Sequence, residues 1–202
     1  MRYGIHVQNS GDFGDAAVLA RLARDAEMAG WDGFFIWDHI LFEVQQPTPV
    51  VDPWVALTAV AMSTERVLLG PLVTPLARRR PWKLARETVS LDRLSGGRLV
   101  LGVGLGDRVE EDFATFDEVV DARLRAAKLD ESLEILVGLW SGEQFTYSGE
   151  HYRLATSVFL PTSAQSPRIP IWVGSGPISG RFVEQPVGTE SSRARRALRW
   201  MR

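Results

Sequence analysis

The stretch VLLGPLVTPLARRRPWKLARETVSLDRLSGGRLVLGVGLG, residues 67–106, decides the fold. Its first part, Val67–Thr74, is an apolar run of strand length that Gly-Pro interrupts. A helix is expected over Pro81–Leu94, because proline favours the first helical position. A second strand, Arg98–Val103, runs into Gly104-Leu105-Gly106. Continuous apolar strands separated by a helix predict two parallel strands joined by a right-handed crossover.

The same alternation of strand and helix continues on both sides of this unit. Strands are expected at Tyr3–Val7, Gly33–Trp37 and Ile169–Val173, helices at Asp15–Ala29, Asp52–Ser63, Asp121–Trp140 and Ser191–Met201, and a hairpin at Phe145–Leu154. Five strand-then-helix units in order indicate an α/β fold, either a barrel or a doubly wound parallel sheet.

Composition excludes several classes of protein. The chain has 202 residues, 45% of them hydrophobic, and a net charge of −2. These values are typical of a globular protein and not of a general nucleic-acid binder, which would be basic. The absence of cysteine removes thiolate metal sites and disulfides and permits a reducing compartment. We see no signal-peptide core and no apolar run of about 18 residues, so a cytoplasmic protein without a membrane partner is expected.

Polar residues at the ends of the expected strands are the candidates for chemistry, because βα folds collect their sites there. His39 could shuttle a proton, or it could be a hydrogen-bonded rim residue beside Asp38. The Gly-x-Gly turns at Gly104–Gly106 and Gly174–Gly176 could admit a phosphate or a planar ring, or be tight turns only. For Arg78-Arg79-Arg80 a solvated loop is favoured over an anion site.

Other motifs are missing from the sequence. There is no GxGxxG opening a helix, no Walker sequence and no GxSxG elbow. The chain has three histidines and no HExxH, so no metal site is expected. Of the remaining histidines, His6 is expected to be a packed or rim residue and His151 a surface residue.

Four stretches carry a resemblance to a known family. They are GWDGFFIWDHI (30–40), the deciding stretch 67–106, RAAKLDESLEILVGLWSGEQFTYSGEHYRL (125–154) and IPIWVGSG (169–176). Together they resemble the luciferase-like flavin-dependent oxidoreductases, which include bacterial luciferase and the F420-dependent reductases.

The resemblance implies a (β/α)8 TIM-type barrel that holds FMN or F420 at its C-terminal rim and oxidises or reduces a small organic substrate. The reduced flavin could come from a separate reductase. His39 falls on the rim histidine that polarises or protonates the reacting group in several members, and Asp107 falls where some F420-dependent members carry a general-acid glutamate. The implied cofactor-binding residues are Pro71, Leu72, Val73, Thr74, Gly104, Leu105, Gly106, Gly174, Ser175 and Gly176. A non-prolyl cis peptide is expected at Pro71-Leu72, and Leu105 lies near the place of a phosphate-binding arginine in luciferase.

The end of the chain departs from the family. A complete barrel needs about 250 residues, and only five βα units fit here. We expect a partial barrel over residues 1–176 and a divergent tail over 177–202, basic and including the expected fifth helix. A partial barrel leaves two unpaired sheet edges, so a homo-oligomer is expected. Two alternatives stay open: a non-catalytic flavin-binding or structural remnant of the family, and an interaction module that uses the tail, where residues 181–202 hold six arginines and two glutamates.

Overall fold

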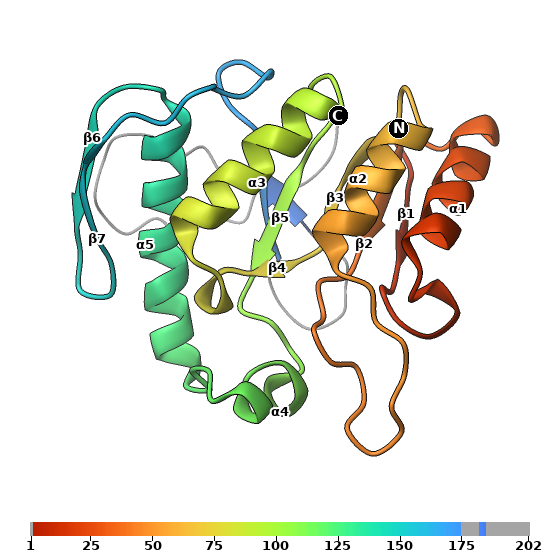
Figure 1. Ribbon diagram of the computed structural model, residues 1–202, viewed down its shortest axis with the longest axis horizontal. Coiled ribbons are helices and arrows are strands. Elements are labelled where there is room, and N and C mark those ends of the chain that lie inside the picture. Colours follow the sequence, from red (N-terminus) through yellow and green to blue (C-terminus); the bar gives the residue numbers. More distant parts are fainter. Residues whose placement is uncertain (1, 175–181, 185–202) are drawn as a thin grey trace.

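A curved wall of parallel strands, covered on one face by helices, makes up most of the molecule (Figure 1). This computed structural model describes residues 2–174 and, for the backbone only, 182–184. The strands are β1 (Gly4–Val7), β2 (Gly33–Ile36), β3 (Leu68–Pro71), β4 (Thr74–Pro75), β5 (Leu101–Gly104), β6 (Phe145–Ser148), β7 (Arg153–Ser157), β8 (Ile171–Gly174) and β9 (Phe182–Glu184). The helices are α1 (Ala16–Met28), α2 (Pro53–Ser63), α3 (Pro81–Leu94), α4 (Val109–Asp112) and α5 (Ala122–Trp140).

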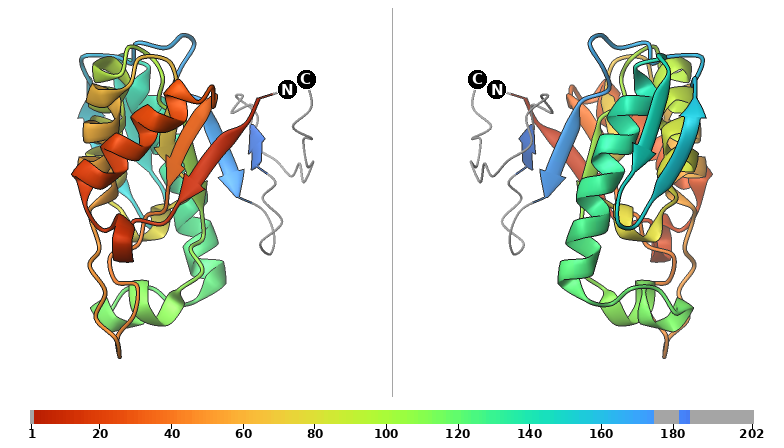
Figure 2. Two further views of the ribbon diagram at one scale, coloured as in Figure 1. Left: turned by 90° about the vertical axis from the view of Figure 1, so that its right-hand side faces the viewer. Right: turned by 90° about the vertical axis from the view of Figure 1, so that its left-hand side faces the viewer.

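The strands follow one another in chain order. β1, β2 and β3 pair in parallel, as do β4, β5 and β8. A parallel bridge between Leu69 and Leu99 joins the two groups. This is the arrangement of a (β/α)8 barrel wall, of which the described residues form four βα units and the strand of a fifth, β8. Seen from the side, the helices α1 and α2 lie together on one face of the wall (Figure 2).

Local sequence explains where the main helices begin. Asp15, Asp52 and Asp121 each accept a hydrogen bond from backbone N–H groups of the first turn, as N-cap residues do. The predicted bounds of α3 are confirmed, and the other expected helices and strands among the described residues lie within a few residues of their observed ends. The predicted strand Val67–Thr74 is wrong as a single element, since it is split into β3 and β4. The helix expected at 191–201 lies outside the described residues.

A short strand extends the wall beyond β8. β9 pairs antiparallel with β8, with Val183 opposite Val173 and Phe182 opposite Gly174. Within the described residues β9 is then the outer strand at this end, so the wall stays open as expected and its edge lies at β9 in place of β8. At the other end of the wall, no strand within the described residues pairs with the outer edge of β1.

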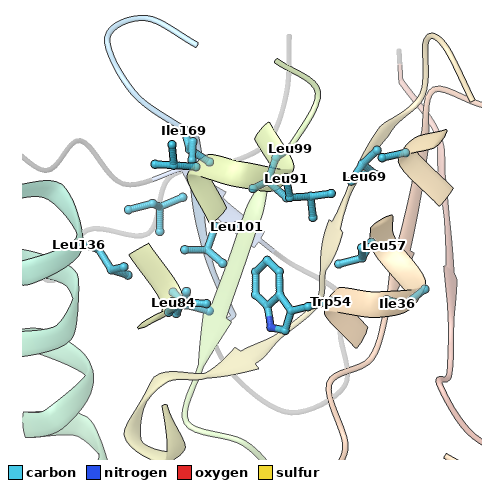
Figure 3. Close-up of a cluster of buried hydrophobic side chains, with 14 of the residues drawn as sticks. Ile36, Trp54, Leu57, Leu69, Leu84, Leu91, Leu99, Leu101, Leu136 and Ile169 are labelled. Atoms are coloured by element: carbon cyan, nitrogen blue, oxygen red, sulfur yellow. The ribbon is translucent and has the colours of Figure 1, made fainter. Parts of the chain in front are cut away.

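The main core fills the space between the wall and its helices (Figure 3). Strand residues Ile36, Leu69 and Leu101 meet Leu57 of α2 and Leu84 of α3, all fully buried. Trp54 and Trp140 are also buried here. This core fixes the strands and therefore the positions of the loops that follow them.

The opposite face of the wall carries a second, smaller cluster. Phe35 and Trp172 lie with ring centroids 5.3 Å apart, although β2 and β8 are separated by other strands. Leu72 and Val100 complete the cluster. A Cβ at Gly70 would overlap the carbonyl oxygen of Val100, so the backbones of these two residues approach closely on this face of the wall.

Three carboxylates, in addition to Asp112 with the N–H groups of Ile40 and Leu41, bind consecutive backbone N–H groups of loops at a distance in sequence. Glu27 accepts from Glu65, Arg66 and Val67. Asp92 accepts from 164–165, and Glu131 accepts from 150–152. We call these three side chains the carboxylate latches. Each satisfies amides that would otherwise lack a partner in a turn.

The first latch gives a pH-dependent prediction. Burial by itself would raise the pKa of Glu27, but the N–H groups of Val67, Arg66 and Glu65 outweigh it and hold that pKa below its usual 4.5. A depressed folded-state pKa adds stability above the unfolded pKa, and this stability is lost as pH falls through the folded pKa. Glu27→Gln is therefore expected to lower the free energy of unfolding by about 1.5–3 kcal/mol near neutral pH.

Urea denaturation of wild type and Glu27→Gln at pH about 7 and about 3 measures this effect. The difference between the two proteins should narrow at the lower pH, since protonation removes the charge that the variant lacks. Asp25→Asn, an exposed acid on the same helix, is the control and should change little. A gap that stays constant with pH would contradict the latch.

Within the described part of the chain, no helix is both long and apolar enough to cross a membrane.

Candidate functional site

The carboxyl ends of the strands meet at one end of the wall, where α4 also lies (Figure 1). The segment after β2 contributes Asp38 and His39, and the segment after β4 contributes Arg78 and Arg79. The segment after β5 contributes Asp112 at the end of α4. We call these five residues the rim network.

His39 is bound to Asp112 and not to its neighbour Asp38. The Nδ1 atom of His39 lies 2.5 Å from Oδ2 of Asp112. The second oxygen of Asp112, Oδ1, accepts the N–H groups of Ile40 at 2.9 Å and Leu41 at 3.3 Å. The side chains of His39 and Asp112 are 11% and 3% exposed, so the pair is largely shielded from water.

The backbone at His39 is held separately. The side-chain amide of Asn9, which is fully buried, donates to the carbonyl oxygens of His39 at 2.9 Å and Val51 at 2.8 Å. Its oxygen accepts the His39 N–H at 3.3 Å. Both the main chain and the ring of His39 therefore have fixed partners.

Two arginines complete the rim network. Arg78 joins both acids, through Nη1 to Asp112 Oδ1 at 3.1 Å and through Nη2 to Asp38 Oδ1 at 2.9 Å. Arg79 donates to both carboxylate oxygens of Asp38 at 2.6 and 2.8 Å, and the hydroxyl of Thr74 donates to Asp38 at 2.9 Å. The side chain of Arg78 is 3% exposed.

The favoured expectation of a solvated Arg78-Arg79-Arg80 loop was therefore wrong for the first two residues. Buried carboxylates need a cation or several donors. Asp38 binds both Arg78 and Arg79, and Asp112 binds Arg78. Arg80 is exposed as expected. Thr74, an expected cofactor residue, has its hydroxyl engaged with Asp38.

The charges of the rim network shift the ionisation of its members. Burial alone would raise the pKa of Asp112, but the bond to His39, the N–H of Ile40 and the charge of Arg78 together lower that pKa below its usual value. Burial would lower the pKa of Arg79, but the carboxylate of Asp38 raises it. Both residues therefore stay charged, which preserves the network over a wide pH range.

Aromatic rings surround the histidine. The ring of Trp37 lies edge-on to His39 at 5.4 Å and to His6 at 5.9 Å, between centroids. Phe42 lies 5.7 Å from His39, and the guanidinium of Arg108 lies over Phe42 at 4.4 Å. The ring of Trp37 therefore contacts both histidines.

The non-prolyl cis peptide is present one residue later than expected. It joins Leu72 to Val73, not Pro71 to Leu72. Pro71 still pairs with Ile36 in the β2–β3 register, and the N–H of Leu72 donates to Ile36 O at 2.8 Å. The β3 strand therefore keeps its regular pairing with β2 through the Pro71-Leu72 peptide, and the cis peptide follows at Leu72-Val73. Nε2 of His6 lies 2.7 Å from the Leu72 carbonyl oxygen, which makes His6 a rim residue.

The expected glycine turns lie at the same end of the wall. Gly104 ends β5, and a Cβ there would lie 2.9 Å from a methyl group of Val73. Arg125 donates to the carbonyl oxygens of Leu105 at 2.6 Å and Gly106 at 3.1 Å. Gly174 ends β8, whereas Ser175 and Gly176 lie outside the described residues. The hydrogen bonds that hold the Gly104–Gly106 turn are therefore made to its backbone carbonyl groups.

Asp107 does not join the rim network. Its side chain is exposed, and its Oδ1 accepts the N–H of Arg108 at 2.9 Å. The acid paired with the His39 ring is Asp112 and not Asp107. Sequence reasoning missed it, because nothing in the run Glu110, Glu111 and Asp112 shows which acid is buried. In the structure only Asp112 is buried. Among the described residues, no group of His, Asp or Glu is arranged to hold a metal ion.

Residues that could hold the flat ring of a flavin or deazaflavin lie at this end of the wall. A Cβ at Gly104 would lie 2.9 Å from a methyl group of Val73, so Val73 and Gly104 pack directly against each other there. The Nη2 groups of Arg78 and Arg79 both donate to Asp38.

Comparison with known proteins agrees with this geometry. The family described as luciferase-like monooxygenase matches residues 2–180. The F420-dependent glucose-6-phosphate dehydrogenase of Nakamurella multipartita is 36% identical over 173 residues, which cover 81% of this chain and 48% of the relative. The F420-dependent hydroxymycolic acid dehydrogenase of Mycobacterium tuberculosis is 34% identical, with 81% and 46% covered.

A solved structure is similar as well. The crystal structure of monooxygenase RslO1 from Streptomyces bottropensis matches with a TM-score of 0.73 and 28% identity, and covers 86% of this chain and 53% of that one. The chain thus spans about half the length of the curated relatives that it matches.

Proposed function

The chain belongs to the luciferase-like monooxygenase family, and from that premise we propose that its rim binds the ring of F420, in preference to FMN, and oxidises or reduces a small organic substrate there. The observation that carries the proposal is the buried His39–Asp112 pair at the carboxyl ends of the strands. The preference for F420 is supported by two relatives that are named F420-dependent dehydrogenases.

The residues of the chain divide into holding and proton-transfer roles. Backbone at Leu72, Val73, Gly104 and Gly106 would support the ring, and Gly174, Ser175 and Gly176 would approach the phosphates. Bound F420 or FMN supplies hydride transfer. Nε2 of His39 would take the hydroxyl proton when an alcohol is oxidised and return it in the reverse reaction.

Asp107 is proposed as a second proton donor. Its carboxylate is exposed at the end of the turn after β5, with one oxygen bound to the Arg108 N–H. The other oxygen is available to a substrate. Because aspartate is one methylene shorter than glutamate, the substrate would have to lie close to this turn.

Titration of the purified chain tests the proposal. F420 and FMN are added separately and binding is followed by cofactor fluorescence, with reduction of F420 by a panel of small alcohols as the turnover assay. Saturable binding of F420 with turnover is expected. Failure to bind either cofactor would contradict the proposal, and binding without turnover would favour the non-catalytic alternative.

Self-association and a cytoplasmic location belong to the same proposal. The outer edge of β1 is free of strand partners among the described residues, and such an edge pairs readily with another chain. A cysteine-free sequence is consistent with a reducing compartment. Sedimentation of the purified chain measures the first of these properties.

A further inference from the structure

We propose that Asp112 is a positioning residue for His39: it holds the imidazole proton on Nδ1 and leaves Nε2 as the nitrogen that exchanges a proton with substrate. The exchange of a proton between Nε2 and substrate rests on the proposed function, whereas the position of the ring proton on Nδ1 does not. Asp112 lies 73 positions from His39 in sequence and reaches it from α4.

The direction of the hydrogen bond follows from the charge of Asp112. An ionised carboxylate can only accept, so Nδ1 must donate across the 2.5 Å separation. Two backbone N–H groups and the Arg78 guanidinium, bound to the other oxygen, favour the ionised form. The lowered pKa of Asp112 agrees with this assignment.

The orientation of the ring follows from its other contacts. Asn9 fixes the His39 main chain on both sides. Trp37 and Phe42 lie beside the ring with centroids within 6 Å. Among the described residues, no hydrogen bond to Nε2 is present. Because Nδ1 is occupied and the ring cannot rotate freely, Nε2 is the nitrogen that a substrate can reach.

Asp112 also has a role that is purely structural, and the two roles can be separated. One oxygen supports the loop through Ile40 and Leu41, and the other contacts His39. Asp112→Asn can keep the first set of bonds through its carbonyl oxygen. Its amide would then point an N–H at Nδ1, which must become an acceptor. The proton is therefore expected to move to Nε2.

Imidazole ¹⁵N spectra of the full chain at pH about 8, where an ordinary histidine is neutral, measure the tautomer without any cofactor. The signals of His39 are identified by their absence from the spectrum of the His39→Gln variant. Wild type should show a proton on Nδ1 of His39, and Asp112→Asn should show it on Nε2. Glu110→Gln, an exposed acid of the same helix, should leave the spectrum unchanged.

Turnover of F420 is the second readout. With the wrong tautomer, kcat is expected to fall by about 10²–10⁴-fold while F420 affinity stays within a few-fold. A wild-type proton on Nε2, or an unchanged tautomer in Asp112→Asn, would overturn the positioning role whatever the cofactor result. A swapped tautomer with unchanged kcat would overturn its link to catalysis. If Asp112→Asn does not fold, the wild-type spectrum alone decides the assignment.

Discussion

The His39→Ala variant is expected to lose about 10²–10⁴-fold in turnover and to bind F420 nearly as well as wild type. The reason is that Nε2 of His39 is the proposed proton-transfer atom, whereas the proposed cofactor surface is made of backbone at Leu72, Val73 and Gly104. Removal of the imidazole leaves that backbone in place. The measurement is kcat for F420 reduction together with a fluorescence titration of F420.

His151→Ala is the matched control for this loss. His151 lies in the turn between β6 and β7, and its main chain is bound to Glu131. The same change of side chain there should leave turnover unaltered. If His39→Ala retained wild-type turnover, the proton-transfer role would be ruled out. If it lost F420 binding as well, His39 would be a cofactor contact instead.

The Arg78→Met variant is expected to lower the free energy of unfolding by about 3–5 kcal/mol, since removal of one partner leaves a buried charge uncompensated. Arg78 is 3% exposed and bridges Asp38 to Asp112. Asp38 retains Arg79, and Asp112 retains His39 and two backbone N–H groups. The loss should therefore fall at the low end of that range. Urea denaturation near neutral pH measures it.

Lys83→Met provides the comparison for an exposed cation. Lys83 pairs with Glu87 at 2.6 Å, but its side chain is 68% exposed, and such pairs contribute about 0–1 kcal/mol. The two variants remove the same kind of charge from sites that differ in burial. Equal losses in both would show that burial of the Arg78 pair has no energetic consequence.

The sequence predicted the wall of strands well, because each element carries its own local signals. The helix α3 begins at a proline, and the apolar runs of β2 and β5 are buried throughout. His39 was also identifiable, since it directly follows a strand end. These features depend on neighbours within a few residues, which a single sequence displays.

The partners of His39 could not be predicted in the same way. Asp112 lies on a four-residue helix with three consecutive acids, and no periodicity selects the one that is buried. The arginines after β4 are indistinguishable from a solvated loop until the fold places Asp38 against them. Contacts made across tens of residues depend on how two loops approach each other, and that information lies in the packing of the strands.

The carboxylate latches constrain the length of the loops that they bind. A loop whose consecutive amides converge on one side chain, as 65–67 do on Glu27, cannot gain or lose a residue without turning those amides away. Its length is in effect fixed by a residue almost forty positions upstream. The 40–50 loop is held at both ends, by Asp112 through the N–H groups of Ile40 and Leu41 and by the Gly11 N–H on the Pro49 carbonyl oxygen. Changes of loop length are therefore expected between these two anchored ends and not in the segments that the latches bind.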